Sequence, residues 1–170
     1  STRVILMTAY SVLDLVKDGL EEGCVGVFYK PLNLDKVIEF VGNVGKGCLT
    51  LVIDGDSNTC DGIKGVLEEK NHTVSCAKNG GDAIMIARDE PIDIAFIQVK
   101  MPVLDGLETF LALKTANPGI TAIMMADNRD EDKDLIEEAI KNGARKCLYK
   151  PLDMEEICSI VDKTYRGKRE

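Results

Sequence analysis

From residue 48 onward, short apolar runs alternate with longer amphipathic stretches. Each run has four or five residues, and each is followed by a stretch in which apolar positions recur at helical spacing. The expected strands are 49–53, 73–77, 94–97, 122–125 and 146–149, and the expected helices are roughly 58–70, 80–89, 105–115, 131–142 and 153–165. Several runs are almost continuously apolar, as is typical of strands that helices cover on both faces. This pattern predicts an α/β fold, a doubly wound parallel five-stranded sheet with right-handed crossovers.

The chain also contains an internal repeat. Residues 23–32 read G-C-V-G-V-F-Y-K-P-L, and residues 143–152, which begin 120 positions later, read G-A-R-K-C-L-Y-K-P-L. Segment 4–9 matches segment 122–127 at an offset of 118, so the second copy has two extra residues, expected in the loop that begins at residue 127. Residues 1–47 therefore resemble the last two units of the complete domain at 48–170, a βαβα half-domain joined to it by the glycine-rich segment 42–47.

Composition is that of an ordinary soluble globular protein. The chain is 45% hydrophobic and 29% charged, and it has no apolar run of membrane-spanning length. Its net charge of -8 argues against direct contact with nucleic acid, because phosphate backbones require basic surface. Six cysteines without a CxxC pair predict reduced thiols in a cytoplasmic protein, and together with a single histidine they leave no ligand spacing for a zinc site. That histidine, His72, is expected to be structural rather than a site of phosphotransfer.

The most specific motif follows the third expected strand. Segment 93–106 reads D-I-A-F-I-Q-V-K-M-P-V-L-D-G. It resembles the phosphoacceptor segment of bacterial response-regulator receiver domains, whose strand ends in an Asp followed by x-x-M-P-x-x-D-G. In that family the Asp takes a phosphoryl group from a histidine kinase, and Gln98 stands in its place here. An amide is a poor nucleophile and a weak metal ligand, so this resemblance implies a receiver without its phosphoryl chemistry.

The same resemblance assigns the other pocket positions of the second domain. Receivers bring two acids, the phosphoacceptor, a Ser or Thr and a Lys together at the carboxyl ends of the strands, where they bind Mg²⁺ and the phosphoryl group. Asp54 matches the first acid and Lys150 the lysine. Gly55 stands at the second acid and Ala126 at the hydroxyl position. The resemblance therefore implies a vestigial pocket with no catalytic residue and no metal, in which Lys150 pairs with Asp54 as a structural contact.

Two further details follow from the fifth expected strand. The bond between Lys150 and Pro151 is often cis in the family. The aromatic residue that changes rotamer on activation corresponds to Cys147 here. Tyr149 is expected to lie on the opposite face of the strand and so not to replace it.

In residues 1–47, Thr8 occupies the hydroxyl position and Lys30 the lysine position. The matching acids and phosphoacceptor would lie upstream of Ser1, outside this sequence. Mg²⁺ is therefore expected only in an intact first receiver. Two strands and two helices are too few to bury a core alone, so a homodimer through this half is also expected if the chain begins at Ser1.

The resemblance implies a tandem-receiver fragment of a two-component, phosphorelay signalling protein that is not an enzyme and carries no cofactor. Its second domain is expected to act as a regulatory or protein-binding module, with a histidine kinase or other signalling domains as partners. The main alternative is a conventional response regulator whose active phosphoacceptor lies in the first receiver. A weaker alternative is FMN binding at the strand ends, although the phosphate loop of such sites is absent.

Overall fold

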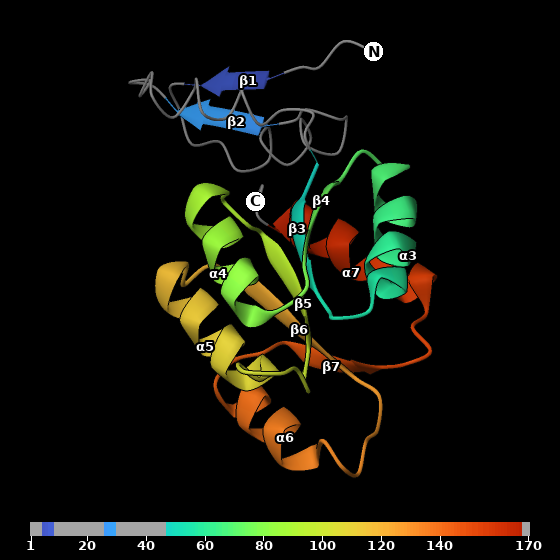
Figure 1. Cartoon of the computed structure of the whole chain (residues 1–170). Helices are drawn as coiled ribbons and strands as arrows, with labels where there is room; N and C mark the ends of the chain where they lie inside the picture. Colours follow the sequence, from blue (N-terminus) through green and yellow to red (C-terminus); the bar gives the residue numbers. More distant parts are fainter. Residues whose placement is uncertain (1–4, 9–25, 30–46, 168–170) are drawn as a thin grey trace. The chain divides into compact units, whose positions relative to one another are not determined.

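The computed structural model describes residues 5–8, 26–29 and 47–167. The chain divides into two compact units, Ser1–Gly45 with Arg169–Glu170 and Lys46–Lys168. In the second unit a parallel sheet of five strands lies between helices (Figure 1). Within the described residues, no helix is both long enough and apolar enough to cross a membrane.

The second unit has the predicted doubly wound α/β architecture, which is flavodoxin-like. Its strands are β3 Leu49–Ile53, β4 Thr73–Ala77, β5 Ile94–Gln98, β6 Thr121–Ala126 and β7 Lys146–Tyr149. Its helices are α3 Ser57–Glu68, α4 Gly80–Asp89, α5 Gly106–Ala116, α6 Lys133–Lys141 and α7 Met154–Gly167. The strands are parallel and lie in the order β4-β3-β5-β6-β7. The predicted doubly wound sheet is confirmed, and each predicted element of 48–167 ends within two residues of its observed bounds.

Apolar residues on both faces of the sheet explain why the central strands are hydrophobic throughout. Alternate residues of β5 enter different clusters: Ala95 and Ile97 pack under α4, α5 and α6, whereas Ile94 and Phe96 pack under α3 and α7. Figure 1 shows the same division, with α4, α5 and α6 on one side of the sheet and α3 and α7 on the other. Since each fully buried aliphatic or aromatic side chain contributes roughly 1.5–3 kcal/mol, this double layer holds the strand ends at fixed positions.

The D-G pair of the sequence motif, Asp105 and Gly106, forms the start of α5. Asp105 is the N-cap of α5: its carboxylate accepts from the Glu108 N–H, and the Glu108 carboxylate accepts from the Asp105 N–H. The next residue is Gly106, where a Cβ atom would lie only 2.3 Å from the Gln98 carbonyl oxygen. Glycine therefore lets α5 begin directly against the end of β5.

The first unit contains two described strands, β1 Ile5–Thr8 and β2 Gly26–Tyr29, which pair in parallel. Their register matches that of β6 and β7: Thr8 pairs with Tyr29, as Ala126 pairs with Tyr149. The other features predicted for this half, namely its helices, Lys30 and most of the glycine-rich segment, lie outside the described residues.

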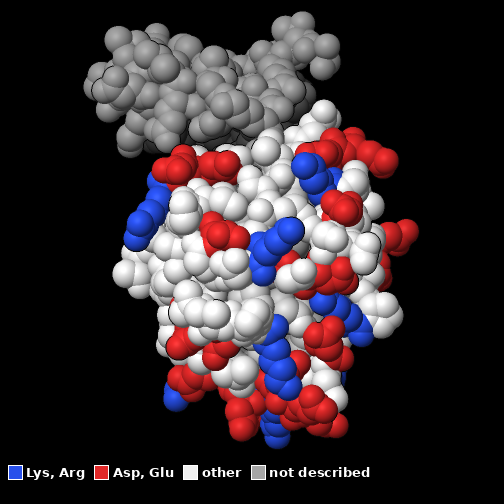
Figure 2. Space-filling model, in the orientation of Figure 1, with Lys and Arg blue, Asp and Glu red and all other residues white. Residues whose placement is uncertain are grey.

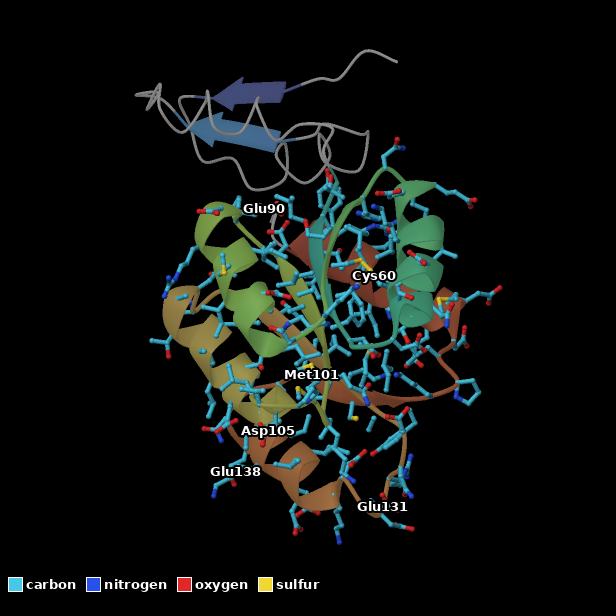
Figure 3. The ribbon with its side chains drawn as sticks, viewed as in Figure 1. Cys60, Glu90, Met101, Asp105, Glu131 and Glu138 are labelled. Carbon is cyan, nitrogen blue, oxygen red and sulfur yellow. A yellow bond between two sulfur atoms is a disulfide. The ribbon has the colours of Figure 1, made fainter. Side chains whose placement is uncertain are left out.

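The expectation that all cysteines are reduced is wrong for one pair. Cys60 of α3 and Cys76 of β4 are joined as a disulfide with a Cα–Cα distance of 6.2 Å, and Figure 3 shows the bonded sulfur atoms at Cys60. Sequence spacing gave no sign of this pair because the fold, rather than a short motif, brings a helix residue over a strand residue. Cys147 and Cys158 are free thiols.

Candidate functional site

The carboxyl ends of β3, β5, β6 and β7 carry the predicted pocket residues. Gln98 is the last residue of β5 and is 4% exposed, Ala126 ends β6 and is fully buried, and Asp54 follows β3 at 6% exposure. Lys150 follows β7 directly, and the peptide bond that joins it to Pro151 is cis, as expected. In Figure 3, the labelled Met101, Asp105 and Glu131 lie at this end of the domain.

Lys150 makes the ion pair that the sequence predicts. Its Nζ lies 2.7 Å from Asp54 Oδ2 and 3.6 Å from Asp127 Oδ1. Burial lowers the pKa of Lys150, but the hydrogen bond and charge of Asp54, together with those of Asp127, outweigh it and raise the pKa above its ordinary value. The lysine is therefore a cation held between two carboxylates.

Gln98 is bound by a residue that sequence comparison did not single out. Its Nε2 donates to Asp127 Oδ2 at 2.5 Å, whereas its Oε1 accepts no hydrogen bond within the described part of the chain. Asp127 immediately follows Ala126, in the loop where the repeat predicts two extra residues. In the sequence, the only sign of this contact is that an acid stands one position after the hydroxyl site. The network Asp54–Lys150–Asp127–Gln98 thus spans the strand ends.

The residues present do not fit a resident magnesium ion. Asp54 Oδ1 accepts from the Asp56 N–H at 2.9 Å, and Asp54 Oδ2 already faces the Lys150 ammonium. Gly55 supplies no ligand, and Asp56 is exposed and instead caps α3 by accepting from the Asn58 N–H. No cluster of three or more His, Cys, Asp or Glu residues suited to a metal occurs among the residues that the structure describes. The pocket therefore lacks the oxygen ligands that Mg²⁺ requires.

A second ion-pair group holds the loop that carries Asp127. Lys100 Nζ lies 3.0 Å from Asp132 Oδ1 and 3.2 Å from Glu131 Oε2, and Asp132 is 2% exposed. The hydrogen bond from Asp132, followed by that from Glu131, raises the pKa of Lys100. These contacts connect the loop after β5 with the start of α6, so the loop from 127 to 132 is attached at both ends.

The prediction for Tyr149 was wrong. Cys147 and Tyr149 both pack against the cluster under α4, α5 and α6, whereas Leu148 enters the other cluster. Residues two apart on a strand share a face, so Tyr149 is on the same side as the family's aromatic position. The Arg129 guanidinium lies 4.4 Å from the centre of its ring. Burial raises the pKa of Cys147 to about 11, so its thiol stays protonated at neutral pH.

His72 has the structural role that the sequence indicates. Its Nδ1 accepts a hydrogen bond from the Cys48 N–H at 2.9 Å, so the ring proton is on Nε2, which lies 3.1 Å from Asp162 Oδ1. Burial acts to raise the pKa of Asp162, but the His72 hydrogen bond and the Lys70 charge lower it overall. The imidazole therefore joins the start of β3 to α7, although these two elements are far apart in the sequence.

Known proteins share both the sequence and the fold of the second unit. Residues 50–162 match the response regulator receiver domain. The chain is 33% identical over 107 residues to the transcriptional regulatory protein ZraR of Klebsiella oxytoca, covering 63% of this chain and 24% of that protein. It is 28% identical over 118 residues to protein PilH of Pseudomonas aeruginosa, covering 69% of this chain and 97% of PilH. The chain thus spans about a quarter of the length of its ZraR relatives.

Solved structures agree with this assignment. A two-component response regulator from Clostridium difficile superposes with a TM-score of 0.65 at 27% identity, covering 72% of this chain and 99% of that one. A response regulator receiver domain from Clostridium thermocellum gives a TM-score of 0.64 at 26% identity, with 71% and 96% coverage. Receiver domains are in general signalling modules of two-component systems rather than enzymes, and they typically bind Mg²⁺ for phosphorylation. By sequence match and by fold, this chain belongs to the response regulator receiver domain family.

Proposed function

We propose that residues 48–170 form a pseudo-receiver, which is not phosphorylated at its strand-end pocket and acts as a regulatory or protein-binding module. The observation that supports this most strongly is the network of side chains across that pocket. Lys150 pairs with Asp54 at 2.7 Å, and Gln98 donates to Asp127 at 2.5 Å. The groups that would contact a phosphoryl group are already bound to each other.

Phosphoryl transfer to this pocket also lacks its reacting groups. The Gln98 amide offers no carboxylate oxygen to attack phosphorus. Ala126 has no hydroxyl to bind a phosphoryl oxygen, and Gly55 removes one acid from the metal site. Charge neutralisation by a metal carries much of the catalysis in phosphoryl transfer. The residues at positions 55, 98 and 126 therefore act together against phosphorylation of this pocket.

The proposed partners are histidine kinases or other signalling domains, as for the family. Acidic and basic side chains are mixed over the face in Figure 2, and the chain's net charge is -8, which favours a protein partner over nucleic acid. Without phosphorylation, the domain's conformation would be set by the partner, because a ligand shifts a two-state equilibrium by its difference in affinity for the two states.

For residues 1–47 we propose the C-terminal half of another receiver. The register of β1 with β2 supports this, because Thr8 pairs with Tyr29 as Ala126 pairs with Tyr149, and Thr8 would then correspond to Ala126. Lys30, outside the described residues, would then correspond to Lys150. A phosphorylatable first receiver would need acids from sequence preceding Ser1. A homodimer through this half remains part of the proposal.

The test is phosphorylation by acetyl phosphate with Mg²⁺, read by intact mass and peptide mapping. We expect no adduct within 48–168 of the natural chain and little on the Gln98→Asp variant. The triple variant Gly55→Asp, Gln98→Asp, Ala126→Thr should incorporate markedly more phosphate. A side chain fits at Gly55, where a Cβ atom has no neighbour closer than the Lys78 carbonyl oxygen at 3.9 Å.

Two outcomes would contradict the proposal. The first is phosphate mapped to any residue of the pocket in the natural chain, including Asp127. If the phosphate were on Asp127, the variant Asp127→Asn would abolish it. The second is full phosphorylation of Gln98→Asp alone, which would make Gln98 the only defect. Circular dichroism and thermal unfolding of each variant provide the control for folding.

A further inference from the structure

We propose that Cys60 and Cys76 form a reversible thiol–disulfide pair that fixes α3 next to the strand-end pocket, and so makes this domain responsive to thiol oxidants. The two residues are 16 apart in sequence, and their Cα–Cα distance of 6.2 Å is within the range that disulfides span. This site is separate from the pocket, and the inference does not depend on whether residue 98 is phosphorylated.

The two cysteines differ in exposure to solvent. Cys76 lies on β4, an edge strand, and is exposed, whereas Cys60, in the first turn of α3, is 7% exposed. Cys76 is two residues from Val74, which packs in the cluster under α3, so both face the helix. A dissolved disulfide can therefore reach Cys76 first, and Cys60 is placed to react with it next.

The reaction balances with a small-molecule disulfide such as oxidised glutathione. The Cys76 thiolate attacks one glutathione sulfur and releases the first glutathione thiolate. The Cys60 thiolate then attacks Cys76 Sγ and expels the second. Two electrons pass to glutathione, the protein disulfide forms, and the two protons of the protein thiols end on the two glutathione thiols. A reduced dithiol such as dithiothreitol reverses the sequence.

The other described cysteines are poorly suited to this exchange. Cys48 and Cys158 are buried, and Cys147 has a pKa of about 11 because of burial. Since the thiolate is the reacting form, a buried thiol or one with a high pKa exchanges slowly at neutral pH. The pair of exposed Cys76 and buried Cys60 is thus the preferred site of thiol–disulfide exchange among the described cysteines.

The bond lies close to the pocket along both elements that it joins. Asp56 caps α3 four residues before Cys60, and Asp54, which pairs with Lys150, is two residues earlier. The Asp54 N–H donates to the carbonyl of Ala77, the neighbour of Cys76, at 3.1 Å. On oxidation, the disulfide and this hydrogen bond together close a ring that contains the loop from Asp54 to Asp56. Reduction opens this ring at the disulfide.

The experiment uses the full chain, reduced and then incubated with a glutathione redox buffer. Thiols are blocked at several ratios of oxidised to reduced glutathione, and the product is mapped by mass spectrometry. We expect one intramolecular disulfide between Cys60 and Cys76, reversible with dithiothreitol, and a thermal midpoint about 5–10 °C higher in the oxidised form. Hydrogen exchange should slow in the loop from Asp54 to Asp56 and in the first turn of α3.

Matched variants separate a reactive pair from an accidental contact. Cys60→Ser should retain a glutathione adduct on Cys76, Cys76→Ser should give none on Cys60, and Cys147→Ser should behave as the natural chain. The proposal is overturned if Cys60 and Cys76 do not pair, or if their disulfide survives dithiothreitol in the folded protein. Unchanged exchange in the Asp54–Asp56 loop on oxidation would overturn the connection to the pocket.

Discussion

Replacing Lys150 with methionine tests how the vestigial pocket is held together. Methionine keeps most of the apolar stem of lysine but leaves Asp54 Oδ2 without the ammonium that lies 2.7 Å away. The Asp54 side chain is 5% exposed and that of Lys150 is 22% exposed. Removing one partner from a fully buried pair costs roughly 3–5 kcal/mol, and partial exposure of the lysine reduces this to about 2–3 kcal/mol.

The assay is urea unfolding of the full chain at pH 7, compared with the double variant Asp54→Asn, Lys150→Met. The double variant leaves no uncompensated charge at this contact, so we expect it to recover at least half of the lost free energy of unfolding. A single variant within about 0.5 kcal/mol of the natural chain would refute the reasoning, because such a value is typical of an exposed ion pair.

The pH dependence gives an independent check on Lys150. Its pKa is raised in the folded domain: burial lowers it, and the Asp54 interaction more than compensates. A raised lysine pKa means that the ion pair contributes fully below the ordinary value of 10.5 and is lost as pH rises through the folded value. The stability difference between Lys150→Met and the natural chain should therefore be constant near neutral pH and shrink above pH 10.5.

Three further changes have defined outcomes. Gly106→Ala should lower the free energy of unfolding by about 2–3 kcal/mol in chemical denaturation, because its Cβ would lie 2.3 Å from the Gln98 carbonyl oxygen; an unchanged midpoint would contradict this. Val103→Gly should raise the free energy of unfolding by about 0.5–1 kcal/mol, because Val103 has a φ of 73° and is 100% exposed, so glycine relieves backbone strain without loss of packing. A lower free energy of unfolding in this variant would contradict the prediction. Alkylation of Cys147 should accelerate about tenfold per pH unit up to its pKa of about 11, and a plateau near pH 8 would show an ordinary thiol.

Sequence patterns predict most of the fold because hydrophobic periodicity and glycine positions are local signals. The continuous apolar runs identify strands covered on both faces, and the D-G pair marks the start of α5, which was predicted at residue 105 and begins at Gly106. Most predicted helix ends differ from the observed ends by one or two residues, because capping depends on neighbouring side chains. For example, Asp56 caps α3 and so begins it at Ser57.

The pocket could be predicted only in part. Family motifs locate Asp54, Gln98 and Lys150, and charge complementarity predicts the pair between the first and last of these. Asp127 could not be placed, because the direction of a side chain after a strand depends on the loop conformation. The Cys60–Cys76 pair depends in the same way on how a helix lies over an edge strand, which spacing alone does not encode.

The hydrogen bonds of His72 have a mechanical consequence. The ring accepts from the backbone of Cys48, just before β3, and contacts Asp162 on α7. A displacement of the chain before Cys48 would thus pull on one side of the imidazole, and α7 would bear the load on the other side. Force applied to the segment that enters the domain therefore has two routes: along the chain into β3, and across a single aromatic ring to the last helix.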